Sequence, residues 1–379
     1  MLDAIIRNGI VIDPITKTET KRSLAIADGK FVPLESVKGE IPLEKSIDAE
    51  GCLVTPGLID SHAHLFYGGT ENGVSPDSTL LPMGITAAVD QGSAGSATFR
   101  AFYDSILART RMHLFATVNL STEGLITSRY PENLDPANVD ESALTSLFQQ
   151  YQNILKGIKL RISKEIVGDL GIAPLKKALD IAEKIGTRVV VHTTNPPVAT
   201  DELLTYFRKE DIYTHVFSQR GYSILSSTGT LLDAVYKARE RGVIFDAADA
   251  RTHYSIPVIQ QALKEKFYPD TISTDLIQKT CFRSSVFGLP MEMSKYLALG
   301  MPLTEIIRTV TYRAAQALHE EKTIGSFQPG ISGDVAIFKL KESRTKMVDR
   351  ENNTIEIPQL LIPQCTILKG KIVYRQFDF

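Results

Sequence analysis

The stretch GLIDSHAH, residues 57–64, decides the fold because it ends a short apolar run with two of the chain's seven histidines. Its first residues predict a strand over 57–61. Side chains two residues apart point to the same side of an extended chain, so His62 and His64 share one face and can bind one metal ion together. Active sites of parallel α/β barrels lie where the strands end. The stretch by itself is a weak motif, and it becomes a candidate metal site at the end of a barrel strand only together with the later strands.

Further strand-like runs follow at regular intervals and alternate with helical segments. In ESALTSLFQQYQNILK, for example, apolar residues recur at helical spacing after Asp140, a good N-cap, and APLKKALDIAEKI ends at Gly186, a good C-cap. Eight strands alternating with helices predict a (β/α)8 TIM-type barrel over 53–325. A doubly wound open sheet gives a similar alternation, and the pattern alone does not separate the two. The expected strands are 57–61, 85–90, 113–119, 157–162, 188–192, 212–217, 243–247 and 271–274.

The two ends of the chain have a different pattern. Residues 1–52 and 326–379 read as short strands separated by glycines and charged turns, without helical crossovers. We therefore expect the two ends to pair into one small β-domain that brackets the barrel. The polar segment 339–354 is expected to be a solvated hairpin loop of that domain.

Bulk composition excludes several classes of function. A formal net charge of -2 over 379 residues gives no basic excess for binding nucleic acid. The three cysteines are far apart and outside any CxxC spacing, which indicates neither disulfides nor a thiolate metal site. No segment reads as a signal peptide or a membrane span. We expect a cytoplasmic protein that acts on a small molecule and binds neither nucleic acid nor membrane; a homo-oligomer is left open.

Three later strands also end in side chains that bind metals. VVVHTT carries His192, IYTHVF carries His215, and TISTDL carries Asp275. Imidazole nitrogen and carboxylate oxygen, without thiolate, suit zinc or a similar divalent ion. In GIKLRIS, Lys159 alternates with apolar residues and is expected to face the barrel interior. If Lys159 has only a structural role, it forms a buried ion pair with an acidic neighbour. A role beside metal ions instead requires the lysine to lose its positive charge.

These motifs resemble the amidohydrolase superfamily of metal-dependent hydrolases. PGLIDSHAH is similar to its first-strand signature, and the similarity extends from IIRNGIVID through PGISGDVAIF to TILKGKIVY, which resemble its flanking β-sandwich. Within the superfamily, YGGTENGV, GITAAVDQGSAG, GIKLRIS, RGVIFD and ISTDL are similar to the dihydroorotase-like deacetylase branch. The resemblance implies a barrel of residues 53–325 and a small β-sandwich formed by 1–52 and 326–379.

The resemblance also implies a site for two divalent ions, with zinc expected. The more buried ion would lie at the first-strand histidines with Asp275, the more exposed ion at the other two histidines, and an N6-carboxylated lysine would bridge them. Two such ions lower the pKa of a shared water, and the resulting hydroxide attacks the substrate carbonyl. Asp275 would be the catalytic residue, first as general base and then as general acid. The implied metal ligands are His62, His64, Lys159, His192, His215 and Asp275.

Two positions depart from relatives and affect the substrate. Dihydroorotases commonly carry an arginine where this chain has Phe66, which disfavours a carboxylated ring. The loop FDAADARTHYS has Asp249 where the deacetylase branch leads us to expect histidine. Substrate contacts are expected among nearby polar side chains, each of which could equally be a surface residue. These candidates are Tyr67, Asn195, Arg220, Arg251 and His253.

The preferred function is hydrolysis of an amide or ester, most simply removal of an acyl group from a small N-acyl or O-acyl amino- or hydroxy-acid derivative. The alternative enzyme is a cyclic amide hydrolase of the hydantoinase, dihydropyrimidinase or dihydroorotase kind. A deaminase is disfavoured because the one-metal deaminases of the superfamily lack the lysine found here at Lys159. A non-catalytic barrel scaffold is the alternative of another class, and the six intact ligand positions argue against it.

Overall fold

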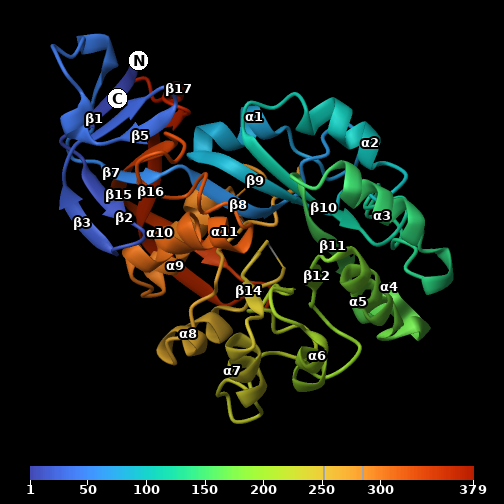
Figure 1. The fold of residues 1–379 in the computed structure, drawn as a ribbon. Coiled ribbons are helices and arrows are strands. Elements are labelled where there is room, and N and C mark those ends of the chain that lie inside the picture. Colours follow the sequence, from blue (N-terminus) through green and yellow to red (C-terminus); the bar gives the residue numbers. More distant parts are fainter. Residues whose placement is uncertain (251, 284–285) are drawn as a thin grey trace.

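The computed structural model describes residues 1–250, 252–283 and 286–379. A curled parallel sheet with helices around it forms the middle of the chain, and the two ends of the chain lie together on one side of it (Figure 1). Within the described residues, no helix is both long and apolar enough to cross a bilayer.

The central sheet has seven parallel strands, each hydrogen-bonded to the next in chain order. Their side chains are largely buried, as expected for strands covered on both faces. Each coincides with one of the first seven strands predicted from the sequence. They are β8 (Leu58–Ala63), β9 (Ile85–Gln91), β10 (His113–Asn119), β11 (Leu155–Arg161), β12 (Val189–His192), β13 (Ile212–Thr214) and β14 (Ile244–Asp246).

The predicted eighth strand, 271–274, is not a regular strand. It joins its neighbours only through isolated bridges, Asp246 to Thr271 and Ala63 to Leu276. Asp275 takes a left-handed backbone conformation, φ 49°, which interrupts an extended ladder at this point. Even so, the amide of Asp275 donates to the carbonyl of His62 at 2.8 Å, and the amide of Ala247 donates to the carbonyl of Thr271 at 2.9 Å. The segment therefore lies between β14 and β8 and bonds to both.

The helices pack their apolar sides on this sheet. In α5 (Ala173–Ile185) the buried residues include Leu175, Ala178 and Ile181, and the helix ends at Gly186 with φ 78°, as predicted. Asp140 caps α3 (Glu141–Gln150) by accepting from the amide of Ala143 at 2.8 Å. The other helices are α1 (Pro76–Leu80), α2 (Phe99–Phe102), α4 (Lys164–Val167), α6 (Thr200–Tyr206), α7 (Asp233–Glu240), α8 (Ile256–Lys264), α9 (Leu289–Ala298), α10 (Leu303–Thr309) and α11 (Tyr312–Ala317).

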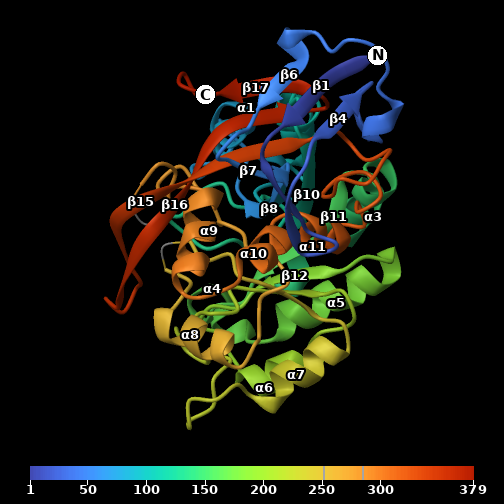
Figure 2. The ribbon, with the colours of Figure 1, turned by 90° about the vertical axis from the view of Figure 1, so that its left-hand side faces the viewer.

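The chain ends form two further sheets that share a hydrophobic cluster, with Ile6 and Ile26 from one sheet and Val54 and Ile337 from the other. Both termini lie at this side of the molecule (Figure 2). The first sheet contains β5 (Lys30–Val32), β4 (Leu24–Ala27), β1 (Leu2–Arg7) and β6 (Ser46–Asp48). The second contains β17 (Lys371–Arg375), β16 (Thr354–Leu368), β15 (Val335–Val348), β7 (Leu53–Pro56), β2 (Ile10–Asp13) and β3 (Thr18–Lys21).

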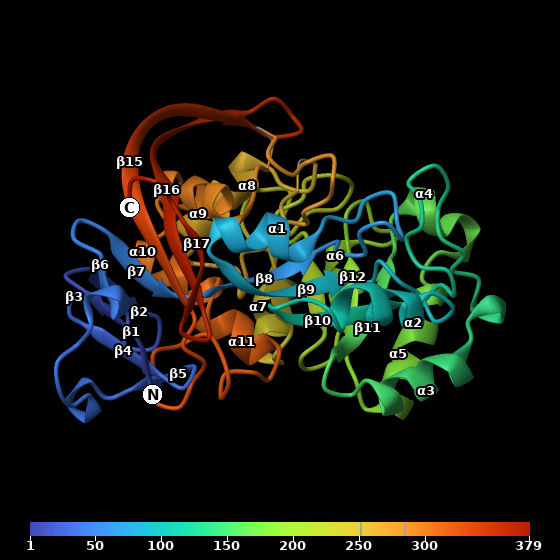
Figure 3. The same ribbon diagram turned by 90° about the horizontal axis from the view of Figure 1, so that it is seen from above.

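Strands β15 and β16 form a long hairpin that leaves the terminal sheet and curves over α9 toward the loops of the central sheet (Figure 3). The prediction of a solvated hairpin over 339–354 is confirmed, but most of the segment is strand and not loop, because 339–348 belongs to β15. Most of its side chains are exposed; Met347 and, on the partner strand, Leu361 are buried. The amide of Leu361 donates to Ser294 Oγ on α9 at 3.0 Å. Packing against α9 thus holds the hairpin over the barrel.

Candidate active site

The strand ends of the central sheet surround a cavity of about 180 Å³. All six side chains expected to bind metal line this one cavity, although they come from widely separated parts of the chain. The cavity thus lies at the carboxyl ends of the strands, where parallel barrels place their active sites.

The two histidines of β8 are held in fixed orientations. His62 Nδ1 lies 3.1 Å from Asp246 Oδ2, and His64 Nδ1 lies 2.9 Å from Ser93 Oγ. The opposite nitrogens face inward, because the Nε2 atoms lie 3.4 Å and 3.2 Å from Asp275 Oδ1. A partner on one ring nitrogen fixes the tautomer and leaves the other nitrogen as a ligand.

His215 provides the clearest sign that the site holds an ion. Its Nδ1 donates to the carbonyl of Ala248 at 2.7 Å, which leaves a lone pair on Nε2. That Nε2 is buried and has no hydrogen-bond partner among the described residues. An orphaned buried acceptor is costly unless something binds it. Ligand atoms of His62, His215 and Asp275 lie within 4.8 Å of one another, so the donor set fits a divalent cation.

Protonation states in the cavity also suit metal binding. Burial lowers the pKa of His62 and of His253 to about 4, and it lowers the pKa of His192 and of His215 well below the usual 6.5. These rings are neutral at neutral pH, the form that binds a metal. Burial raises the pKa of Asp275, but the neighbouring His62 and His64 outweigh this and hold that pKa well below its usual range.

Lys159 lies at the centre of the site on β11. It is 1% exposed, and its Nζ lies 3.3 Å from His62 Nε2. Burial lowers the pKa of its amine to about 8. A larger neutral fraction is therefore available than for an ordinary lysine with a pKa near 10.4.

Two buried aspartates that the sequence reading left without a role support the site. Asp246 Oδ1 accepts from Thr271 Oγ1 and from Ser273 Oγ, both at 2.7 Å, while its Oδ2 orients His62. Asp60 Oδ2 accepts from Thr274 Oγ1 at 2.6 Å and fixes the segment that carries Asp275. Each is an aspartate in a buried strand of the central sheet, a signal that could have identified both.

The expected substrate contacts fall in different places. Tyr67 is 54% exposed, and neither it nor Asn195 nor Arg220 is among the residues that line the metal cavity. Asn195 Nδ2 donates to Glu165 at 2.8 Å, and Arg220 pairs with the same carboxylate at 2.7 Å. Arg251 lies outside the described residues.

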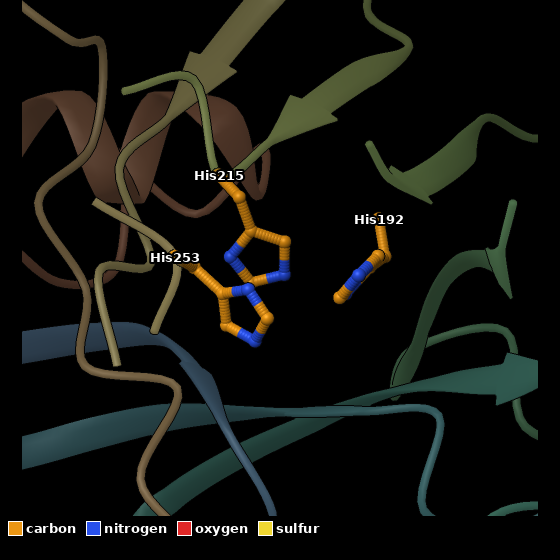
Figure 4. Close-up of side chains that lie close together, drawn as sticks. All are labelled: His192, His215 and His253. Atoms are coloured by element: carbon orange, nitrogen blue, oxygen red, sulfur yellow. The ribbon is translucent and has the colours of Figure 1, made fainter. Parts of the chain in front are cut away.

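His253, in contrast, lies inside the cavity. Its Nδ1 is 2.9 Å from Thr194 Oγ1, and its ring centroid lies 4.3 Å from that of His215 and 4.9 Å from that of His192. Figure 4 shows the three rings gathered around one space. Asp249 of the same loop points elsewhere: it is fully buried and binds Lys295 and the hydroxyl of Tyr296.

Phe66, which stands where dihydroorotases commonly carry an arginine, lies in the hydrophobic core. Phe66 is 6% exposed and packs on Phe102 with ring centroids 4.9 Å apart. Its side chain belongs to the hydrophobic core, and it is not among the residues that line the metal cavity.

A second cavity of about 760 Å³ adjoins the first and shares His253, Asp275 and Ile277 with it. The β15–β16 hairpin supplies part of its wall. Its acidic residue on the hairpin, Asp349, accepts from the backbone amide of Ile256 at 2.9 Å and is buried. We call this second cavity the vestibule; its cationic residues are Lys279, Arg283, Lys346 and Arg350.

A curled parallel sheet whose strand ends gather imidazoles, a carboxylate and a buried lysine defines the class of metal-dependent hydrolases. The sequence model of the Amidohydrolase family matches residues 53–373. The chain belongs to that family, and it is a hydrolase that acts on C–N or ester bonds.

Known relatives agree with this assignment. A deacetylase of Enterococcus faecalis is 28% identical over 372 residues, covering 98% of each chain. A solved structure described as an adenine deaminase is 27% identical with a TM-score of 0.90, covering 99% of this chain and 100% of the other. A structure described as a dihydroorotase is 25% identical with a TM-score of 0.88, covering 98% of both. This chain is similar to all three, and their names cover three different reactions.

Proposed function

We propose that this hydrolase removes an acyl group from a small N-acyl or O-acyl amino- or hydroxy-acid derivative, using two divalent ions, with zinc the expected metal. The observation that carries the proposal is the convergence of six ligand-type side chains around the orphaned Nε2 of His215. The name of the deacetylase relative, which covers almost the whole chain, supports deacylation over the other two reactions.

Each of the two ions would be bound by its own set of side chains. His62 and His64 with Asp275 would hold the more buried ion, and His192 with His215 the more exposed one. Lys159 would bridge both after its neutral amine attacks carbon dioxide, forming a carbamate and releasing a proton. Its lowered pKa supports this step, because only the neutral amine has a lone pair to attack. When bound, the two ions would lower the pKa of a shared water and polarise the acyl carbonyl.

Asp275 is the proposed proton carrier. Both first-strand imidazoles contact its Oδ1, at 3.4 Å and 3.2 Å, whereas the nearest imidazole to Oδ2 is that of His253 at 3.8 Å, so Oδ2 is the oxygen that would accept the proton of the attacking water. Metal-bound imidazoles have no such free acceptor. Asp275 would then return the proton to the leaving amine or alkoxide.

The vestibule supports an acid as the rest of the substrate. Lys279 pairs with Glu71 at 3.1 Å and Lys346 with Glu356 at 3.2 Å. Among the described residues, no carboxylate pairs with Arg283 or Arg350. A substrate carboxylate that enters the vestibule could therefore pair with the guanidinium groups of Arg283 and Arg350, which line the same cavity as Asp275.

One substrate panel tests the reaction. Purified protein, with its metal content measured, would be given N-acetylated amino acids and O-acetylated hydroxy acids in both configurations, alongside hydantoin, dihydroorotate and adenine. Release of acetate from an acetylated acid supports the proposal. Ring opening without deacetylation would replace it with the cyclic amide hydrolase, and ammonia release from adenine with a deaminase. Protein that binds no divalent ion and turns over nothing would be a scaffold.

We also infer that the terminal sheets form a β-sandwich unit made of 1–52 and 326–379, with 53–325 as the barrel. Their shared hydrophobic cluster supports this, although β7, at 53–56, lies in the terminal sheet. A cytoplasmic location, a small-molecule partner and any homo-oligomer remain predictions. Cell fractionation and light scattering of the purified chain would test the first and the last.

A further inference from the structure

His253 has the surroundings of a metal ligand, although the resemblance gives it no such role. Each of His192, His215 and His253 offers a ring nitrogen, and these nitrogens lie within 4.8 Å of one another. Zinc holds nitrogens at about 2.0–2.1 Å, so two ligating nitrogens lie at most about 4.2 Å apart. The nitrogens therefore exceed the spacing that one ion allows by at most about 0.6 Å.

The orientation of His253 is fixed from outside the cavity. Thr194 Oγ1 lies 2.9 Å from Nδ1, and Thr194 follows directly on the end of β12, which carries His192. The other nitrogen, Nε2, lies 3.8 Å from Asp275 Oδ2, on the side of the proposed metal site, and 3.5 Å from Thr252 Oγ1, a long contact that a metal ion would replace. Such a partner on one ring nitrogen is the arrangement found behind metal-bound histidines.

The loop that carries His253 is anchored independently of any ion. Asp249 binds Lys295, which also pairs with Glu292, and all three side chains are fully buried. On the far side of the loop, Tyr254 donates to the carbonyl of Val348 on the hairpin at 3.2 Å. These contacts anchor Asp249 and Tyr254, which lie on either side of His253 in the chain, through protein groups alone.

We propose that His253 is a third imidazole ligand of the more exposed ion, together with His192 and His215. This inference rests on the proposed metal binding and deepens it. Three histidines are a known set of protein ligands for a catalytic zinc ion. With this set the exposed ion would still bind when the bridging Lys159 is removed, whereas the buried ion would depend on the bridge.

The alternative is that His253 contacts only the substrate. The two roles separate by metal binding alone, without any substrate. Full-length protein would be stripped with a chelator and titrated with Zn²⁺ and with Co²⁺, whose visible absorption reports the ligands. The variants are His253→Gln, Lys159→Ala and their double combination, with His319→Gln as a matched control. His319 is an exposed imidazole that pairs with Glu210 and does not line the metal cavity.

We expect wild type and His319→Gln to bind two ions, and Lys159→Ala to retain about one. His253→Gln should lower the affinity for one of the two ions by at least about 10- to 100-fold, because removing even a hydrogen-bond partner of a ligand causes a loss of that size. It should also change the Co²⁺ spectrum. The double variant should lose the ion that Lys159→Ala retains.

The inference is overturned if His253→Gln binds two ions with wild-type affinity and spectrum, or if the double variant binds its ion as tightly as Lys159→Ala. Wild-type protein that binds no ions would instead overturn the proposed function. Circular dichroism and thermal unfolding of the stripped proteins check that each variant is folded; a variant that is not folded would be replaced by His253→Asn.

Discussion

Replacing Asp275 with asparagine separates its two proposed tasks. The amide is nearly the same size and keeps an oxygen where Oδ1 meets His62 and His64 at 3.4 Å and 3.2 Å, but it loses the negative charge and the proton acceptor. Losing a general base costs about 10²–10⁴ in rate. At about 1.36 kcal/mol for each tenfold change, that is roughly 2.7–5.4 kcal/mol of activation free energy, with a further loss from weaker metal binding.

The assay is hydrolysis of an N-acetyl amino acid, measured with metal content and across pH. The wild-type rate should fall below about pH 6–7, where the hydroxide shared by the two ions becomes protonated to water. The Asp275 carboxylate stays ionised over this range, because His62 and His64 hold its pKa well below the usual value. Asp180→Asn on α5, an exposed aspartate paired with Lys184 at 2.9 Å, is the matched control and should keep the wild-type rate. An Asp275→Asn enzyme with wild-type turnover at full metal occupancy would refute the reasoning, and the proton would then have to pass through another group in the cavity.

The remaining predictions concern other parts of the site. Lys159→Ala should lose nearly all activity, and a short carboxylic acid should restore some of it; no rescue, together with no labelled carbon dioxide on the wild-type lysine, would contradict the bridging role. Asp246→Ala should lower metal affinity by about 10- to 100-fold, because it releases the His62 ring, and unchanged affinity by titration would show that the ring needs no such support. Arg350→Ala should raise KM for acidic substrates more than for their amides, with Lys341→Ala on the same hairpin as the control; equal effects on both substrates would remove the charge argument. Metal-free protein should become less stable as pH falls from about 6.5 to about 4, because His62 and His253 have pKa values of about 4 in the folded chain and take up protons at higher pH in the unfolded chain. Each histidine contributes a slope of at most about 1.4 kcal/mol per pH unit to the free energy of unfolding. Thermal melts that do not change over this range would contradict the prediction.

Local patterns were enough to predict the strands of the central sheet. The spacing of His62 and His64 is a property of one extended segment, and the short, almost continuously buried runs of β8–β14 can be read directly from the chain. The segment 271–274 joins its neighbours through isolated bridges and is followed at once by the left-handed backbone of Asp275. No propensity in TISTDL carries that information.

Other features depend on contacts between distant residues. The partnership of His62 with Asp246 spans 184 positions, so sequence spacing could not show it. Likewise, the charges of 339–354 predict a solvated hairpin loop, but 339–348 is part of β15, whose partner strand β16 packs on α9. Asn195, Arg220 and His253 all looked alike as polar loop residues, and only the folded chain shows that His253 alone enters the metal cavity.

The pairing of β7 with β15 has a consequence for how the chain is made. Thr55 and Ala336, which are bonded across this pair, are 281 residues apart. At about 5–20 residues per second, the ribosome needs roughly 15–60 s to deliver the partner of β7. Throughout that time the edge of β7 that pairs with β15 has no partner strand, and the cluster around Val54 lacks Ile337. An unpaired strand edge can pair with another chain. A stop codon before β15 would leave that edge of β7 unpaired permanently.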